Sequence, residues 1–537
     1  MKFKSLNLEK IVPLTLLSVT LFISPISSYD PINLIKLICL SVGGALSFWA
    51  ILTTKNLFKT QPDRIFLVPV CLFIVWRILS YFFSDVSNLD GLYGVFGRNN
   101  GLLTSISLAL ICIYAAQISN NKTITSATNI LVICGGLSAA YGLIQSLGLD
   151  PFDWTTAYTP VFGFLGNPNF HSSFMAMTAA ASLLLILKYK DNQKKVFYLA
   201  LGILSLYNID KTESQQGFVV FSIITFFGFY LLLRRKIQSF FLDLIVLLLS
   251  SISLCAITLD LLRKAPWPSL LYEDSVTYRG DFWRAGISMV VKNPIWGVGP
   301  DGYRDNYMRY RDFAAATRPG ADQITDSAHN YFIDIASTGG LPLFILYLLI
   351  QILLLVRVFK KIKNETISLD FIVIFIVWLG FSIQSLISIG NLGLQVWGWA
   401  LTGYLIGHKI EDKPNDNFKV KFSSPTLYIL VILSLILTIP KFSNDIRFRT
   451  SVEKSDVKGV LDSALNWPQD VHRMNYVSKI FRENGLEKEA VEVARAAVKV
   501  NPQNVEVWRE LSLLSNTIES EKRLAKKNII KLDPLGK

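Results

Sequence analysis

The residue best suited to chemistry in this sequence is a histidine in a polar segment. His329, followed by Asn330, lies in a long polar stretch between apolar runs. A hydroxyl group attacks at neutral pH only when a base takes its proton, and an imidazole titrates in the range that this task needs. We therefore expect His329 to act as a general base or to orient a hydroxyl group, with Asn330 positioning it.

Cations suited to binding a concentrated negative charge accompany this histidine. Arg279 and Arg284 precede it in the same polar stretch, Arg98 lies in a Gly-rich segment, and Lys211 lies between two short apolar runs. A guanidinium group binds phosphate-like oxygens through planar, paired hydrogen bonds. This set predicts a site that stabilises an anionic group.

Each of these residues also has a purely structural interpretation. Arg98 could be a solvated loop cation, and His329 could simply begin a helix. Arg279 could form a salt bridge with Asp281 or Glu273. Arg77 lies inside an apolar run, where a charge is costly unless it reaches the interface or lines a cavity.

The elements that must position these residues are those of a membrane protein. The chain has 537 residues, of which 51% are hydrophobic and 17% charged, with a mean hydropathy of +0.40. Apolar stretches of about 15 to 23 residues predict bilayer spans, and the expected fold class is an all-α, polytopic helical membrane protein. The predicted spans are 11–29, 33–54, 65–83, 102–119, 126–148, 170–188, 196–210, 217–233, 241–262, 340–358, 370–389, 391–408 and 425–440.

Lys and Arg indicate how these spans are oriented, because short cytoplasmic loops are enriched in them. One alternating set of loops is rich in Lys and Arg, whereas the short loops of the other set contain only Arg98 and Lys211. The N-terminus is therefore expected in the cytoplasm and the C-terminal tail outside the cell membrane. The net charge of +13 then reflects topology and anionic lipid head groups, and a nucleic-acid partner is not implied. The first span is not expected to be a cleaved signal peptide.

The spans divide the chain into four predicted regions. Spans one to nine occupy residues 1–262, a long extracytoplasmic loop occupies 263–339, spans ten to thirteen occupy 340–440, and an extracytoplasmic helical tail occupies 441–537. In the tail, Pro468, Pro502 and Pro534 recur every 32 to 34 residues. This period resembles a tetratricopeptide repeat. Two interpretations stay open, a docking platform for a large acceptor or a helical cap on the membrane domain.

Two turn motifs frame the polar loops. Asn167 and Asn169 flank Pro168, which suits the start of a helix, so they are expected to shape the turn that opens the sixth span. Gly297 and Gly299 are expected to form a tight turn beneath the site. They also begin a literal G-x-G-x-x-G pattern, but no βαβ unit surrounds it, so nucleotide binding is not predicted.

Three pieces of the long loop, taken in order, resemble the O-antigen ligase and polymerase superfamily, which includes the pilin O-oligosaccharyltransferases. These pieces are Arg279-x-x-x-Trp283, Pro294-x-x-Gly297-x-Gly299 and His329-Asn330. The resemblance covers most of residues 90–410. It implies a GT-C-like enzyme that transfers a glycan from an undecaprenyl-diphosphate carrier to an acceptor hydroxyl of a lipid, glycan or protein at the outer face of the membrane.

By this resemblance, His329 matches the essential histidine of the family, and the arginines bind the donor diphosphate. The family usually carries Ser-Arg between its two short middle spans, whereas this sequence has Ser214-Gln215. Either Lys211 supplies the missing charge or the donor is held differently.

No cofactor or metal is expected. The sequence has no HExxH, Walker or clustered His/Cys motif, and its five cysteines lie in apolar runs without a CxxC pair, so structural disulfides are not expected. Three rival functions remain at this stage: a polysaccharide polymerase, a transporter of lipid-linked glycans and a non-enzymatic scaffold.

Overall fold

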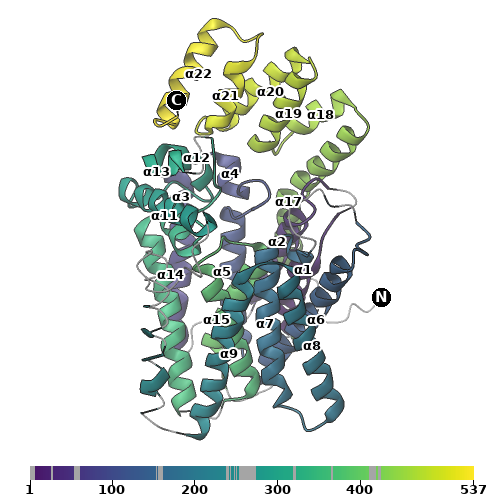
Figure 1. Cartoon of the computed structure of the whole chain (residues 1–537), viewed down its shortest axis with the longest axis vertical. Coiled ribbons are helices and arrows are strands. Elements are labelled where there is room, and N and C mark those ends of the chain that lie inside the picture. The colour runs from purple at the N-terminus through teal and green to yellow at the C-terminus, as the bar shows by residue number, and fades with distance from the viewer. Residues whose placement is uncertain are drawn as a thin grey trace.

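The computed structural model of the chain is almost entirely helical (Figure 1). One two-stranded antiparallel pair joins β1 (Leu6–Asn7) to β2 (Lys419–Val420). The predicted all-α membrane fold class is confirmed. The structure describes residues 6–25, 28–53, 61–152, 154, 161–237, scattered positions between 241 and 255, 274–318, 322–364, 367–409, 419–420 and 425–536.

A bundle of long apolar helices forms the larger part of the molecule. Within the described residues, seven helices are long and apolar enough to cross a membrane. They are α2 (Asn33–Thr53), α3 (Gln61–Phe83), α6 (Asn121–Ser146), α7 (Pro168–Ile186), α9 (Gln215–Lys236), α14 (Tyr331–Asn364) and α17 (Pro425–Glu453). Also in the bundle are α1 (Ile11–Leu21), α5 (Leu102–Ile118), α8 (Asn192–Lys211), α15 (Leu369–Ser385) and α16 (Leu392–Gly407).

Each predicted span except the ninth coincides with one of these helices. The predicted span 241–262 falls mostly outside the described residues. Two helices extend well beyond the predicted spans, because α14 begins at Tyr331 and α17 continues to Glu453. The number of crossings made by the shorter helices stays a prediction.

The centre of the bundle is α16, whose residues are buried along its whole length. Two glycines bring it close to α5. A Cβ atom at Gly403 would lie 2.1 Å from the carbonyl oxygen of Cys112, and one at Gly407 would lie 1.9 Å from that of Ala116. Small residues at such positions let two membrane helices pack backbone to backbone. This packing fixes the frame from which the polar loops extend.

One end of the bundle, here called the loop end, is covered by shorter helices. The helices α4 (Asn88–Tyr93), α11 (Asp274–Lys292), α12 (Tyr303–Tyr310) and α13 (Phe313–Thr317) lie there, with the tail helices beyond them (Figure 1). The tail helices are α18 (Val457–Leu465), α19 (Val471–Glu483), α20 (Glu487–Val500), α21 (Val505–Leu513) and α22 (Glu519–Leu532).

The tail helices end where the sequence predicts. Pro468, Pro502 and Pro534 follow α18, α20 and α22, respectively. Ala490 and Ala494 are buried on one face of α20, as expected where paired helices pack closely. The helical nature of the tail is therefore confirmed, and its likeness to tetratricopeptide repeats stays a prediction.

The tail packs directly against the loop end. The side chain of Arg304 in α12 binds Glu506 in α21 at 2.8 Å. The amide of Asn501, after α20, donates to both Asp90 in α4 at 2.8 Å and Asp305 in α12 at 2.6 Å. The long loop and the tail thus lie together, as the predicted topology requires.

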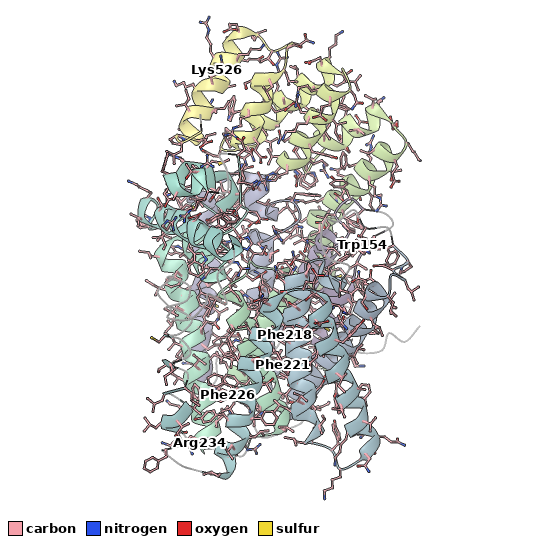
Figure 2. The ribbon with its side chains drawn as sticks, viewed as in Figure 1. Trp154, Phe218, Phe221, Phe226, Arg234 and Lys526 are labelled. Atoms are coloured by element: carbon pink, nitrogen blue, oxygen red, sulfur yellow. The ribbon has the colours of Figure 1, made fainter. Side chains whose placement is uncertain are left out.

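The opposite end of the bundle carries residues of the predicted cytoplasmic set. Figure 2 shows Arg234 at the end far from Lys526 of the tail. Lys188 pairs with Asp370 at 2.6 Å, joining the segment after α7 to the first turn of α15. This separation agrees with the charge pattern, although the orientation across the membrane stays a prediction.

Candidate active site

The candidate site is built around a sharp bend in α14. Gly340 has φ 75° and ψ 176°, which interrupts the helix. The backbone N–H of Leu341 donates to the carbonyl of Pro294 at 2.8 Å, and that of Val298 donates to Ser337 at 2.8 Å. The turn after α11 therefore packs into the bend and fixes the position of the segment that begins α14.

The predicted turn glycines are essential to this packing. Gly297 and Gly299 have positive φ values of 66° and 94°, a region that favours glycine. A Cβ atom at Gly297 would lie 2.5 Å from the carbonyl oxygen of Ser337, and one at Gly299 would lie 2.3 Å from the hydroxyl oxygen of Ser84. The glycines thus form a tight turn against α14 and the end of α3.

His329 lies immediately before α14 in a strained backbone conformation. Its φ is 52°, in the left-handed region that non-glycine residues rarely adopt and that is found disproportionately at functional sites. Its N–H donates to the hydroxyl of Ser327 at 3.2 Å. The imidazole ring lies 5.6 Å, centroid to centroid, from the ring of Phe282 in α11. The partly buried ring is therefore held between the loop and α11.

Asn330 positions the histidine indirectly. Its side-chain oxygen accepts hydrogen bonds from the N–H groups of Phe332 at 3.0 Å and Ile333 at 3.2 Å, which caps the first turn of α14. Its amide nitrogen donates to the carbonyl of Leu386 at 2.9 Å. Asn330 therefore anchors the start of α14 and, through the backbone, the adjacent His329.

Burial and two arginines set the charge state of His329. The pKa of the imidazole is lowered to about 4, mainly by burial. The charges of Arg279 and Arg98 also lower this pKa, whereas the charge of Asp326 raises it. An ordinary histidine has a pKa near 6.5. His329 is therefore neutral at physiological pH and can accept a proton. The role predicted for Arg98 and Arg279 at this ring stays a prediction.

Arg98 and Asp326 form an ion pair of 2.5 Å at the edge of the site. Burial alone would raise the pKa of Asp326, but the charge and hydrogen bond of Arg98 outweigh it, so the pKa is lowered. Asp326 therefore carries a full negative charge that holds the guanidinium group of Arg98 in place.

A cavity of about 50 Å³ lies beside this pair, between α3, α5 and the start of α14. The charged side chains that line this cavity are Arg77, Arg98, Asp301, Asp326 and Asp334. Opposite charges packed this closely in a largely buried space are typical of functional sites in membrane proteins.

Asp301 ties the Arg98 loop to the long loop. Its carboxylate accepts hydrogen bonds from the N–H of Val95 at 2.8 Å and that of Asn100 at 3.2 Å. Burial raises the pKa of Asp301 to about 6, although these two hydrogen bonds and Arg77 oppose the rise. Asp301 and Asn99 also have positive φ values, 55° and 56°. Strained residues thus gather at this site from both loops.

Arg77 is the cation that the sequence marked inside a span, and it does line the cavity. Its guanidinium group donates to both the carbonyl and the hydroxyl of Thr338 at 3.1 Å, and to the hydroxyl of Ser105 at 3.3 Å. All of these acceptors are neutral. The described contacts of Arg77 therefore include no ion pair that would compensate its positive charge.

Two predicted cations lie away from this cluster. Arg284 binds Asp281 and, at 2.6 Å, Asp312, so it belongs to a salt-bridge network of the long loop. Lys211 ends α8, where it lies 3.2 Å from Asp210 and 5.6 Å from the ring centroid of Tyr207. Neither residue lines the charged cavity.

The predicted turn motif at the sixth span has a structural role. Asn167 caps α7 by accepting a hydrogen bond from the N–H of Asn169 at 2.9 Å. The side chain of Asn169 in turn accepts a hydrogen bond of 2.7 Å from the hydroxyl of Ser214. The amide of Gln216 donates to Ser173 at 2.9 Å. Ser214 and Gln216 therefore bind polar groups of α7, whereas Gln215 between them is exposed.

Comparison with known families gives one match. Residues 199–348 match the family described as O-antigen ligase. This segment is less than a third of the chain, and its similarity supports the O-antigen ligase superfamily. The match runs from α8 to the first part of α14 and includes Arg279 and His329. Members of this family are membrane glycosyltransferases of the ligase and polymerase type that act on lipid-linked glycans. A search of the curated proteins finds no match.

The sequence did not predict the acidic side of this candidate site. The charged cavity is lined by three aspartates that the sequence analysis did not single out, Asp301, Asp326 and Asp334. Asp301 follows the Gly297 turn directly, and Asp326 precedes His329 by three residues. Proximity to those motifs was the available signal. Among the described residues, no group of three or more His, Cys, Asp or Glu is arranged to hold a metal ion.

Proposed function

We propose that this protein transfers a glycan from an undecaprenyl-diphosphate carrier to an acceptor hydroxyl of a lipid, glycan or protein. The observation that carries the proposal is the Arg98–Asp326 ion pair of 2.5 Å, in which Asp326 lies three residues before His329, a partly buried imidazole packed on Phe282. A proton acceptor and a diphosphate-binding pair are the two functions that this reaction requires.

In the proposed reaction, the acceptor oxygen attacks the anomeric carbon of the first sugar. The bond between that carbon and the diphosphate oxygen breaks, and its electron pair leaves with the carrier. His329 takes the proton of the acceptor hydroxyl, and the arginines stabilise the negative charge that builds up on the diphosphate. Attack opposite to the leaving group inverts the configuration at the anomeric carbon.

The donor diphosphate is proposed to bind Arg98 and Arg279, with Arg77 as the third cation. Arg77 lines the charged cavity and contacts only neutral acceptors among its described hydrogen bonds. We therefore assign to Arg77, instead of Lys211 or Arg284, the charge that the family usually supplies from its Ser-Arg motif. A diphosphate would compete with Asp326 for Arg98.

The proposed orientation places this site at the outer face of the cell membrane. The loop end holds both the long loop and the tail, and the basic residues Lys188 and Arg234 lie in the other set of connections. With the N-terminus in the cytoplasm, the loop end faces outward.

The test uses purified protein in detergent with a polyprenyl-diphosphate oligosaccharide and candidate acceptors. His329→Asn removes the proton acceptor while keeping a residue that tolerates φ 52°, and we expect a loss of about 100-fold or more in transfer rate. The matched control is His408→Asn, because His408 binds Asn121 at 3.1 Å at the opposite end of the bundle. Unchanged transfer by His329→Asn would rule out the assigned base.

The same assay separates the rival functions. A product that is a longer lipid-linked glycan identifies a polymerase, whereas a glycan on a different lipid or on a protein identifies a ligase. Movement of the lipid-linked glycan across vesicle membranes without any product would favour a transporter.

A further inference from the structure

A second, larger cavity opens next to the candidate active site. It is a groove of about 730 Å³, within the size range of ligand pockets. Arg98 and Asp326 line both this groove and the charged cavity. A molecule whose reacting end lies at the Arg98–Asp326 pair would therefore extend its remainder into the groove.

Trp154, Asp326 and Asn391 line the groove together with four longer parts of the chain at the loop end. These parts are the connection between α1 and α2, the connection between α4 and α5, the segment from 162 to 170, and the last turns of α17. The α1–α2 connection is fixed to α17, because Arg449 donates to the carbonyl of Ser28 at 3.1 Å and the N–H of Asp30 donates to Asp445 at 2.9 Å. The groove is thus a built feature of the fold.

Aromatic side chains form the apolar part of the groove. Trp154 lies at the side of the molecule, between the membrane helices and the tail (Figure 2). Its indole N–H donates to Asp150 at 3.0 Å, and its ring packs edge-on against Phe162 at 5.1 Å. Asp150 also accepts from the hydroxyl of Tyr141 at 3.0 Å and the amide of Gln145 at 2.8 Å. The orientation of the Trp154 ring is therefore set before any ligand arrives.

Tyr29 presents a second ring from the α1–α2 connection. It is 45% exposed although it packs against Phe96 at 6.0 Å and Phe448 at 5.0 Å. A large ring left half open in a lined groove offers a flat apolar surface to a ligand.

Two residues that line the groove, Asp30 and Asn391, carry buried polar atoms without hydrogen-bond partners among the described residues. The Oδ2 atom of Asp30 and the Oδ1 atom of Asn391 are buried and have no hydrogen-bond partner within the part of the chain that the structure describes. Asp30 is 5% exposed and Asn391 is 5% exposed. Buried acceptors are normally satisfied, so two unsatisfied ones in residues that line one groove favour a ligand that donates hydrogen bonds.

We propose that this groove binds an oligosaccharide whose reacting sugar lies at the Arg98–Asp326 pair. Sugars present apolar C–H faces that stack on aromatic rings and many hydroxyl groups that donate to carboxylate and amide oxygens, which are the two chemistries that the groove offers. A polyprenyl chain would leave Asp30 and Asn391 unsatisfied, because it has no donors. The proposal rests on the proposed function for the identity of the reacting sugar, and the bound glycan comes from either the donor or the acceptor.

Binding of soluble glycans tests the groove without any transfer. The probes are the oligosaccharide released by mild acid from the cell's own polyprenyl-diphosphate pool and the glycan released from its surface acceptors, each titrated calorimetrically against the full-length protein. We expect Trp154→Ala to raise the Kd for one probe by about tenfold. Trp467→Ala is the matched control, because Trp467 is 50% exposed in the tail and does not line the groove.

The probe that responds identifies the source of the glycan. A loss confined to the first probe assigns the groove to the donor, and a loss confined to the second assigns it to the acceptor. Tyr29→Ala serves as a second variant, since its half-exposed ring can be removed if Trp154→Ala fails to fold. Wild-type protein that binds neither probe, or variants at both positions that bind unchanged, would overturn the proposal.

A donor with a single sugar separates failure of the groove from failure of the proposed function. Such a donor fills less of the groove, so we expect Trp154→Ala to slow transfer of the full oligosaccharide several-fold more than transfer of the single-sugar donor at low donor concentration. Absence of transfer by the wild-type protein would contradict the proposed function, and the calorimetric result would still decide the groove.

Discussion

Arg311 and Asp533 form an ion pair of 2.9 Å in which both side chains are fully buried. The pair joins the residue that follows α12 to the residue that follows α22. Asp533 also accepts from Arg509 at 2.6 Å, and Arg509 reaches Asp322 at 3.0 Å. The last helix of the tail is therefore fastened to the same loop that carries His329.

Removal of this carboxylate should release the tail. Asp533→Ala removes the buried carboxylate that binds both Arg311 and Arg509, and we expect the free energy for opening of α22 to fall by about 3–5 kcal/mol. Hydrogen exchange of α22 amides measures this change. Glu521→Gln is the control within the same tail, because its pair with Arg495 is partly exposed and should contribute about 0–1 kcal/mol. Equal protection of α22 in wild type and Asp533→Ala would contradict this role.

The pH dependence of transfer should report the unusual state of His329. Its pKa is lowered to about 4, and the base must be neutral to accept a proton. We therefore expect kcat/KM to stay insensitive to this group near neutral pH and to fall as pH drops through about 4, whereas an ordinary histidine would lose activity below about 6.5. A bound diphosphate adds negative charge, so the inflection of kcat should lie at a higher pH than that of kcat/KM.

Two substitutions should move this inflection in opposite directions. Asp326 raises the pKa of His329, whereas Arg279 lowers it. Asp326→Asn should therefore shift the inflection of kcat/KM to lower pH, and Arg279→Gln should shift it to higher pH. The position of the inflection is the readout, because both variants also change the rate itself. A shift of the same sign in both variants would contradict the effect assigned to one of the two charges.

Much of the fold could be predicted because its cause is local. Apolar runs of helical length determine α2 or α7 without reference to any other segment, and Pro502 ends α20 by removing a backbone donor. Both Arg279 and His329 lie in recognisable motifs of one loop, and their placement in one site stays a prediction.

The remainder of the site depends on contacts between distant segments. Arg284 carries the same charge as Arg279 and lies five residues away, yet Asp281 and Asp312 hold it elsewhere. Arg77 enters the cavity because the bend of α14 brings the Thr338 carbonyl to α3. Asp301 matters because its carboxylate binds a loop some 200 residues earlier in the chain. No pattern in the neighbouring sequence predicts any of these three contacts.

The bend in α14 should be the most sensitive backbone feature of the site. Gly340 has φ 75°, and a Cβ atom there would lie 2.1 Å from the carbonyl oxygen of Ile295. Gly340→Ala would force apart the turn and the helix that position His329, and we expect a loss of stability of at least about 1–3 kcal/mol together with loss of transfer. Thermal unfolding and the transfer assay measure the two effects.

Gly136→Ala is the matched control for this substitution. Gly136 lies within α6, and its added Cβ atom would meet only Leu201, at 4.0 Å. Alanine is favoured over glycine inside a helix by about 0.5–1 kcal/mol, so this variant should retain transfer and unfold at the wild-type temperature or slightly above it. If Gly340→Ala behaved like Gly136→Ala, the bend would not be what holds the loop against α14, and the position of His329 would have to depend on Asn330 and Phe282 instead.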